Sequence, residues 1–130
     1  MEYSLSQEQL NGVEEVLRKD LIELGVRAVI LIDMAGNIVA QLVSGETKHD
    51  IYALAALAAG NFGAVSAMAK MIGDEEFSLL FHKGKQESIH LSKVMTDFLL
   101  ITIFGHETSL GFLRLKVDES IEKIKNILTA

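Results

Sequence analysis

The chain has 130 residues, of which 49% are hydrophobic and 23% are charged, and it contains no proline, cysteine or tryptophan. The lack of cysteine excludes disulfides, cysteine-ligated zinc and thiol nucleophiles. The net charge of −6, without a basic stripe, argues against nucleic-acid or membrane binding. The length predicts one domain over residues 1–130. Because the first residues do not read as a signal peptide, we expect a cytoplasmic protein.

The first predicted element is a helix from about Ser6 to Leu24. Ser6 followed three residues later by Gln9 is a capping-box pattern that marks the start of a helix. Gly25 stands where a left-handed residue ends a helix. Apolar residues at spacings of three and four predict one buried stripe, made of Leu10, Val13, Leu17, Leu21 and Leu24.

A strand pair is predicted next. Residues 26–33 are apolar on both faces, which indicates a central strand covered on both sides. Residues 34–37 read as a turn, and residues 38–43 as the returning strand of a β-hairpin.

The second predicted helix, residues 48–72, has an unusual composition. Thr47 and Asp50 form a capping-type start, and Gly73 marks the end. The stretch from Ile51 to Ala69 carries no charge and is nearly long enough to cross a bilayer. It consists mostly of alanine and glycine, which gain little from transfer to lipid. We therefore expect a helix buried on more than one side rather than a membrane span.

Two faces of this helix differ in bulk. The small-residue seam has almost no side-chain volume and consists of Ala53, Ala56, Gly60, Gly63 and Ala67. The bulky face consists of Leu54, Leu57, Val65, Met68 and Ile72. One face can pack on the sheet, and the other then lies bare, which invites close approach by another helix or another protein.

Three more strands and a helix complete the chain: residues 77–82, 87–93, 98–104 and 110–128. In the second of these strands polar side chains alternate with apolar ones, so we expect one face to contact water, with Ser88, His90 and Ser92 on it. The order α-β-β-α-β-β-β-α, dominated by hairpins, predicts an α/β (α+β) fold with a five-stranded, mostly antiparallel sheet. The first and last helices would cover one face and the middle helix the other.

Motifs for catalysis are absent from the sequence. There is no phosphate-binding glycine loop, no HExxH zinc motif and no nucleophile elbow. The histidines at 49, 82, 90 and 106 show no ligand spacing, and for each we expect a surface or strand-edge position. The acidic run at residues 74–76 is more typical of a loop than of a metal site. We therefore predict no catalytic residue, no cofactor and no metal, and interpret the chain as an interaction module.

Four blocks in a particular order carry a family resemblance. They are VRAVILIDMAGNIVAQ (26–41), LAALAAGNFGAVSAMAKMIG (54–73), EFSLLFHKGKQESIHLSKV (76–94) and DFLLITIFGHETSLGFLRLKV (97–117). Together they resemble the Roadblock/dynein light-chain family and, within it, the bacterial MglB-like branch. The resemblance covers about residues 6–128 and implies the Roadblock fold, which is profilin- and longin-like.

The resemblance also implies a function. Members of the family form homodimers through the middle helix and the third strand, which here implies an interface containing Ala53, Ala56, Gly60, Gly63, Ala67, Phe77 and Leu79. They serve as platforms for small Ras-like GTPases. The MglB branch is similar to activators of an MglA-type GTPase in bacterial polarity and gliding motility. Such activators reposition the catalytic residues of the GTPase and insert no arginine.

Two other interpretations remain open at this level. Roadblock domains also act as scaffolds or cargo adaptors of the dynein light-chain type, which bind another protein without acting on a nucleotide switch. An enzyme of unknown chemistry would require a deep polar pocket. A neighbouring gene for a small GTPase would favour the regulator, and a neighbouring motor or sensor-kinase gene would favour the adaptor.

Overall fold

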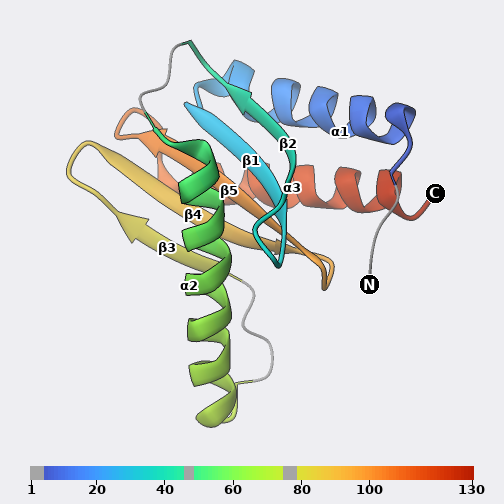
Figure 1. Cartoon of the computed structure of the whole chain (residues 1–130). Helices are drawn as coiled ribbons and strands as arrows, with labels where there is room; N and C mark the ends of the chain where they lie inside the picture. The colour runs from blue at the N-terminus through green and yellow to red at the C-terminus, as the bar shows by residue number, and fades with distance from the viewer. Residues whose placement is uncertain (1–4, 46–48, 75–78) are drawn as a thin grey trace.

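The computed structural model describes residues 5–45, 49–74 and 79–130, which form three layers (Figure 1). A five-stranded antiparallel sheet lies in the middle, with two helices behind it and one in front. The strands lie in the order β2-β1-β5-β4-β3. Their bounds are Ala28–Asp33 (β1), Ile38–Val43 (β2), Leu79–Lys83 (β3), Glu87–Val94 (β4) and Phe98–Gly105 (β5). The predicted element order and α+β fold are confirmed.

Helices α1 (Gln7–Asp20) and α3 (Leu110–Leu128) cover the same face of the sheet. The predicted capping box is present, because the Ser6 hydroxyl accepts a hydrogen bond from the Gln9 amide and the Gln9 side chain accepts one from the Ser6 amide. α1 ends four residues before the predicted Leu24. The backbone leaves helical geometry at Leu21 and continues as a short 3₁₀ turn.

The core on this face is built from large aliphatic side chains. Val13 and Leu17 of α1, Val117 and Ile124 of α3, and Val29 of β1 are fully buried together. Each such side chain contributes about 1.5–3 kcal/mol through removal from water. This layer is therefore the main source of stability within one chain.

Strand β4 corrects one prediction. Its polar face does not contact water, because Ser88, His90 and Ser92 lie on the side covered by α3 and are buried. His90 is 1% exposed, so the predicted surface or edge position is wrong for this histidine. Alternation showed that the polar residues share a face, but only the path of α3 determines that the face is covered.

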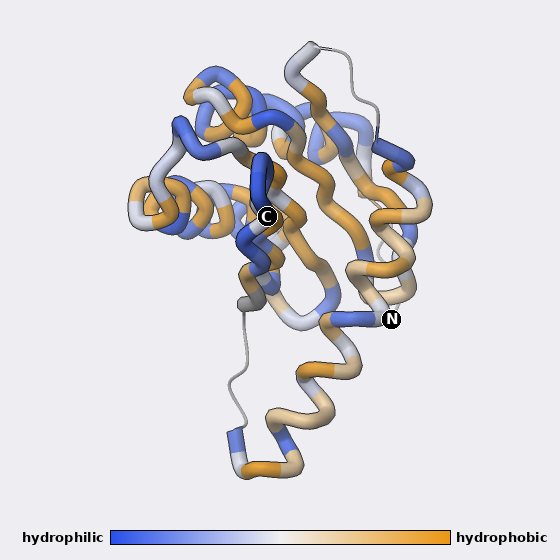
Figure 2. Tube along the Cα trace, turned by 90° about the vertical axis from the view of Figure 1, so that its left-hand side faces the viewer, coloured by the Kyte–Doolittle hydropathy of each residue, from blue (hydrophilic) through white to orange (hydrophobic). Residues whose placement is uncertain are grey.

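Helix α2 (Ile51–Met71) covers the other face of the sheet (Figure 1). Asp50 caps it as predicted, accepting a hydrogen bond from the Ala53 amide at 3.1 Å, whereas Thr47 lies outside the described residues. Length and composition alone would also allow α2 to cross a membrane, but here its inner face packs on the sheet. Figure 2 shows α2 projecting past the sheet, with hydrophobic residues along most of its length.

Candidate interaction surface on helix α2

The inner face of α2 is neither of the two faces singled out from the sequence. The residues that pack on the sheet are Ile51, Ala55, Ala58, Ala59 and Phe62. Three of these five residues are alanines, and the helix contacts β1 and β5. The expectation that α2 is buried on more than one side within the chain is wrong, since one face alone contacts the sheet.

The small-residue seam lies on the side of α2 turned away from the sheet. All five of its residues are exposed. With 3.6 residues per turn, Gly60 lies almost opposite Phe62, which is buried. A β-carbon added at Gly60 or Gly63 would meet no atom within 4 Å. The glycines therefore have no packing role within the chain, and the seam is a flat strip of exposed backbone.

The bulky face of α2 is also largely exposed. Leu57 is 72% exposed, Met68 58% and Ile72 85%, whereas Val65 is half-buried and Leu54 is half-buried against the sheet. Exposed apolar residues continue at both ends of the helix, with Tyr52 and Met71. Large exposed apolar surfaces on a folded domain commonly mark a site of protein contact, which makes this face a candidate interaction surface.

A groove runs beside the first half of α2. Its volume is about 560 Å³, and it separates the helix from the β3 and β4 side of the sheet. Ala53, Leu54 and Leu57 form the helix wall, while His82 and Ile89 form the opposite wall. The first turns of the bulky face, together with Ala53 of the seam, are therefore directed toward the edge of the sheet at which β3 lies.

The turn between β1 and β2 supports α2 from the side. Gly36 has a φ of +93°, and a β-carbon at this position would lie 3.1 Å from Cα of Ala56. The Asp33 carboxylate accepts hydrogen bonds from the amides of Ala35 and Asn37 and from the Asn37 side chain. Partial burial opposes ionisation of Asp33, but these hydrogen bonds outweigh it and lower its pKa. The turn is thus held rigid where it touches the helix.

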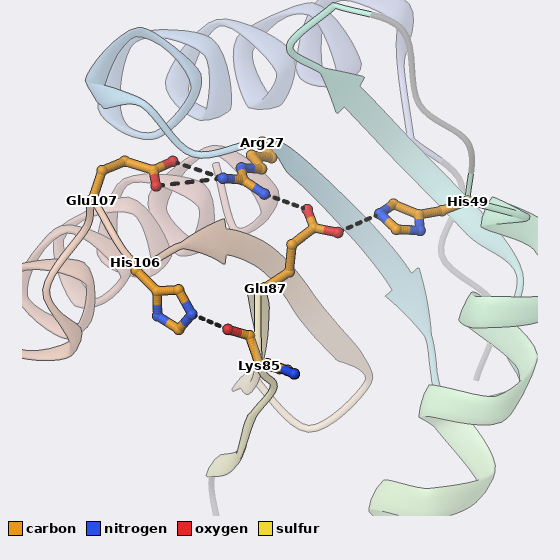
Figure 3. Close-up of polar contacts among 6 residues, drawn as sticks. All are labelled: Arg27, His49, Lys85, Glu87, His106 and Glu107. Atoms are coloured by element: carbon orange, nitrogen blue, oxygen red, sulfur yellow. Dashed lines mark hydrogen bonds and ion pairs between the residues drawn. The ribbon is translucent and has the colours of Figure 1, made fainter.

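A charged cluster lies where α2 begins (Figure 3). Arg27 bridges two carboxylates, at 3.1 Å from Glu87 and 3.3 Å from Glu107, and His49 lies 3.0 Å from the far oxygen of Glu87. The hydrogen bond that Arg27 donates to Glu87 is the main cause that raises the pKa of Arg27. All four side chains are at least partly exposed, so the cluster joins the starts of β1, β4 and α2 without forming a buried reactive centre.

The remaining histidine and acidic side chains do not gather into a second site among the described residues. Among the described residues no group of three or more histidine, aspartate or glutamate side chains could hold a metal. His106 contacts the carbonyl oxygen of Lys85, and His90 is buried on the opposite face of the sheet. Of the predicted interface residues outside α2, Leu79 is the first residue of edge strand β3 and pairs with Ser92, and Phe77 lies outside the described residues.

Most of the chain matches a known domain family. Residues 12–104 match the model of the Roadblock/LC7 domain. The chain belongs to the Roadblock/LC7 domain family. The family match spans α2, β3 and the groove between them, so the candidate surface is part of the Roadblock domain. A protein of Aquifex aeolicus described as uncharacterized is 24% identical over 129 residues, which are 97% of this chain and 78% of the relative.

Solved structures agree with the Roadblock assignment. The gliding protein MglB of Thermus thermophilus superposes with a TM-score of 0.89 at 28% identity, covering 99% of this chain and 98% of that one. Myxococcus xanthus MglB gives a TM-score of 0.86 at 28% identity over 95% and 92% of the two chains. A further structure described as MglB with a tetrameric arrangement gives 0.89 at 27% identity over 99% and 98%. The predicted MglB-like resemblance is confirmed at the level of structure.

Proposed function

We propose that this Roadblock protein is a homodimeric, cytoplasmic platform that binds a small Ras-like GTPase of the MglA type and modulates its GTP hydrolysis. The observation that supports it most directly is the exposed apolar surface of α2 on a fold similar to MglB throughout its length. A monomer would leave Leu57, Met68 and Ile72 in water. The tetrameric arrangement of one MglB structure is consistent with self-association in this group.

The geometry of α2 suggests how a second copy is placed. The first turns of the bulky face are directed toward β3, and β3 is an edge strand with one unpaired side. A second copy that pairs along β3 would therefore bring its own α2 beside the bulky face, across the groove. The same contact would cover the turns of α2 that project past the sheet (Figure 2). The seam would lie along the outer surface of this helix pair, where a partner can approach the backbone closely.

Arginine positions favour an indirect effect on hydrolysis. The chain has arginine at 18, 27 and 114 only. Arg18 and Arg114 lie on α1 and α3, behind the sheet and away from α2, and Arg27 is held by Glu87 and Glu107. An inserted arginine commonly stabilises the transition state of GTP hydrolysis. Because no arginine here projects from the α2 surface, we propose that the protein repositions residues of the GTPase itself.

The test is to mix the purified protein with the Ras-like GTPases of the same organism, loaded with GTP or with GDP. We expect a complex that depends on the nucleotide and a faster single-turnover hydrolysis of GTP. Binding without any change in hydrolysis would identify the adaptor alternative. Failure to bind every such GTPase in either nucleotide state would refute the proposal.

A further inference from the structure

The second edge of the sheet, strand β2, lies on the opposite side of the sheet from β3. Its sequence, IVAQLV, contains no charge and no proline. Edge strands commonly carry lysine, proline or other charges that discourage pairing with another chain. Strand β2 has neither, so the part of its outer edge from Ala40 to Val43 is open to pairing with another chain.

The hydrogen-bonding groups of β2 that point outward can be assigned from its register with β1. Ser44 donates its amide to the Arg27 carbonyl at 2.8 Å, so residues 44, 42 and 40 face β1 in alternation. The amides and carbonyls of Gln41 and Val43 therefore point away from the sheet. Val39 is the extra residue of a bulge, between the pairs Leu31–Ala40 and Ile32–Ile38.

A groove of about 550 Å³ follows this edge. Its floor is the continuous stretch 36–41, and its two walls are Glu14 of α1 and Tyr52 of α2, which come from opposite faces of the sheet. Tyr52 is 74% exposed and offers a flat apolar surface. Among the described residues that line the groove, Glu14 is the one charged side chain, and the protein carries a net charge of −6. The groove thus complements a positively charged ligand.

We propose that the outer edge of β2 binds an extended, basic segment of another protein as a sixth strand of the sheet. Backbone hydrogen bonds to Gln41 and Val43 would supply the affinity, as in other cases of strand addition. A lysine or arginine opposite Glu14 and an apolar side chain against Tyr52 would determine which peptide sequences bind best. β2 is about 20 Å long, which matches a segment of about six residues. The site lies at the opposite edge of the sheet from β3 and therefore remains accessible when β3 pairs with a second copy.

The probe is a short peptide of alternating valine and lysine, titrated into the ¹⁵N-labelled full chain. We expect the amide resonances of Gln41 and Val43 to shift with saturation, and a peptide N-methylated at alternate residues to lose binding. A Glu14→Lys variant should bind about tenfold more weakly, and Gln41→Pro, which removes an outward amide and is tolerated at a sheet edge, should bind at least as weakly. Gln41→Ala is the matched control and should bind like the unmodified chain.

Three outcomes would overturn the proposal. The first is an absence of shifts at Gln41 and Val43 at millimolar peptide, and the second is shifts confined to β3 or α2. The third is a lower mass of the protein alone after Gln41→Pro, measured by light scattering, because β2 would then pair with a second copy. The N-methylated peptide keeps the test valid if Gln41→Pro fails to fold, since it leaves the protein unchanged.

Discussion

The two faces of the sheet are covered in opposite ways. On the α1 and α3 side, large aliphatic residues fill the core, and the outer surface of α1 carries charges such as Glu15, which pairs with Arg18 and Lys19. On the α2 side, three of the five helix residues packed on the sheet are alanines, and the outer surface of the helix is largely apolar. A helix whose outer face contacts solvent usually has polar residues on that face, whereas the outer face of α2 is largely apolar. The difference supports the proposal that the α2 layer, more than the α1 and α3 layer, is completed by other molecules.

The largest expected effect compares one leucine from each side. Leu17→Ala removes a fully buried side chain from the α1 layer and should lower the free energy of unfolding by about 2–5 kcal/mol. Leu57→Ala on α2 should change it by less than about 0.5 kcal/mol if the residue faces water. Urea unfolding at several protein concentrations measures both. An effect of Leu57→Ala that grows with protein concentration would show that a second copy covers Leu57. If Leu57→Ala and Leu17→Ala lowered the free energy of unfolding by the same amount at every concentration, the proposed difference between the two sides of the sheet would be wrong.

A second prediction compares two exposed helical glycines. Gly60→Arg places a charge in the seam, where burial by a partner would cost about 3 kcal/mol, a loss of affinity of more than a hundredfold. Gly111→Arg on α3 is the matched control, because a β-carbon at either glycine meets nothing within 4 Å, and both variants should fold normally. Light scattering and a GTPase binding assay show which contact is lost. Wild-type mass together with wild-type GTPase binding for Gly60→Arg would exclude the seam as an interface.

A smaller effect on stability is expected from the buried polar residues on the side of the sheet that α1 and α3 cover. Neither ring nitrogen of His90 nor the hydroxyl of Thr102, its cross-strand neighbour, has a hydrogen-bond partner among the described residues. Burial, with a further contribution from Arg114 and an opposing one from Asp118, lowers the pKa of His90. The unfolded chain therefore binds the proton more tightly, and stability is lost as the pH falls below about 6.5, by at most about 1.4 kcal/mol per pH unit.

The variant His90→Leu should remove this dependence and make the protein more stable at pH 5 than the unmodified chain. Thr102→Val is the control, because it removes the other unpartnered group without removing a titrating one. It should change the free energy of unfolding by about 1 kcal/mol, and by the same amount at pH 5 and at pH 7.5. Thermal unfolding across this pH range measures both variants. A His90→Leu chain that keeps the full acid sensitivity would show that another group is responsible.

Much of the fold could be predicted because each element carries its own signal. The capping box at Ser6, the apolar run of β1 and the uncharged stretch of α2 identified their elements without any knowledge of their neighbours. Errors arose where burial depends on a distant segment. His90 shares a face with serines, which suggested contact with water, but the path of α3 covers that face. The Arg27–Glu87–Glu107 cluster joins residues too far apart in the chain for any spacing rule to find.

By itself the sequence determined the order of the elements, the faces of each helix relative to one another and the family. Periodicity achieves this because it is a local property of a helix or strand. Only the tertiary structure decided which face of α2 touches the sheet. The alanine face packs on the strands and buries Phe62 there, while most of the bulky face stays exposed. That choice depends on the combined shape of two surfaces, which no single segment of sequence contains.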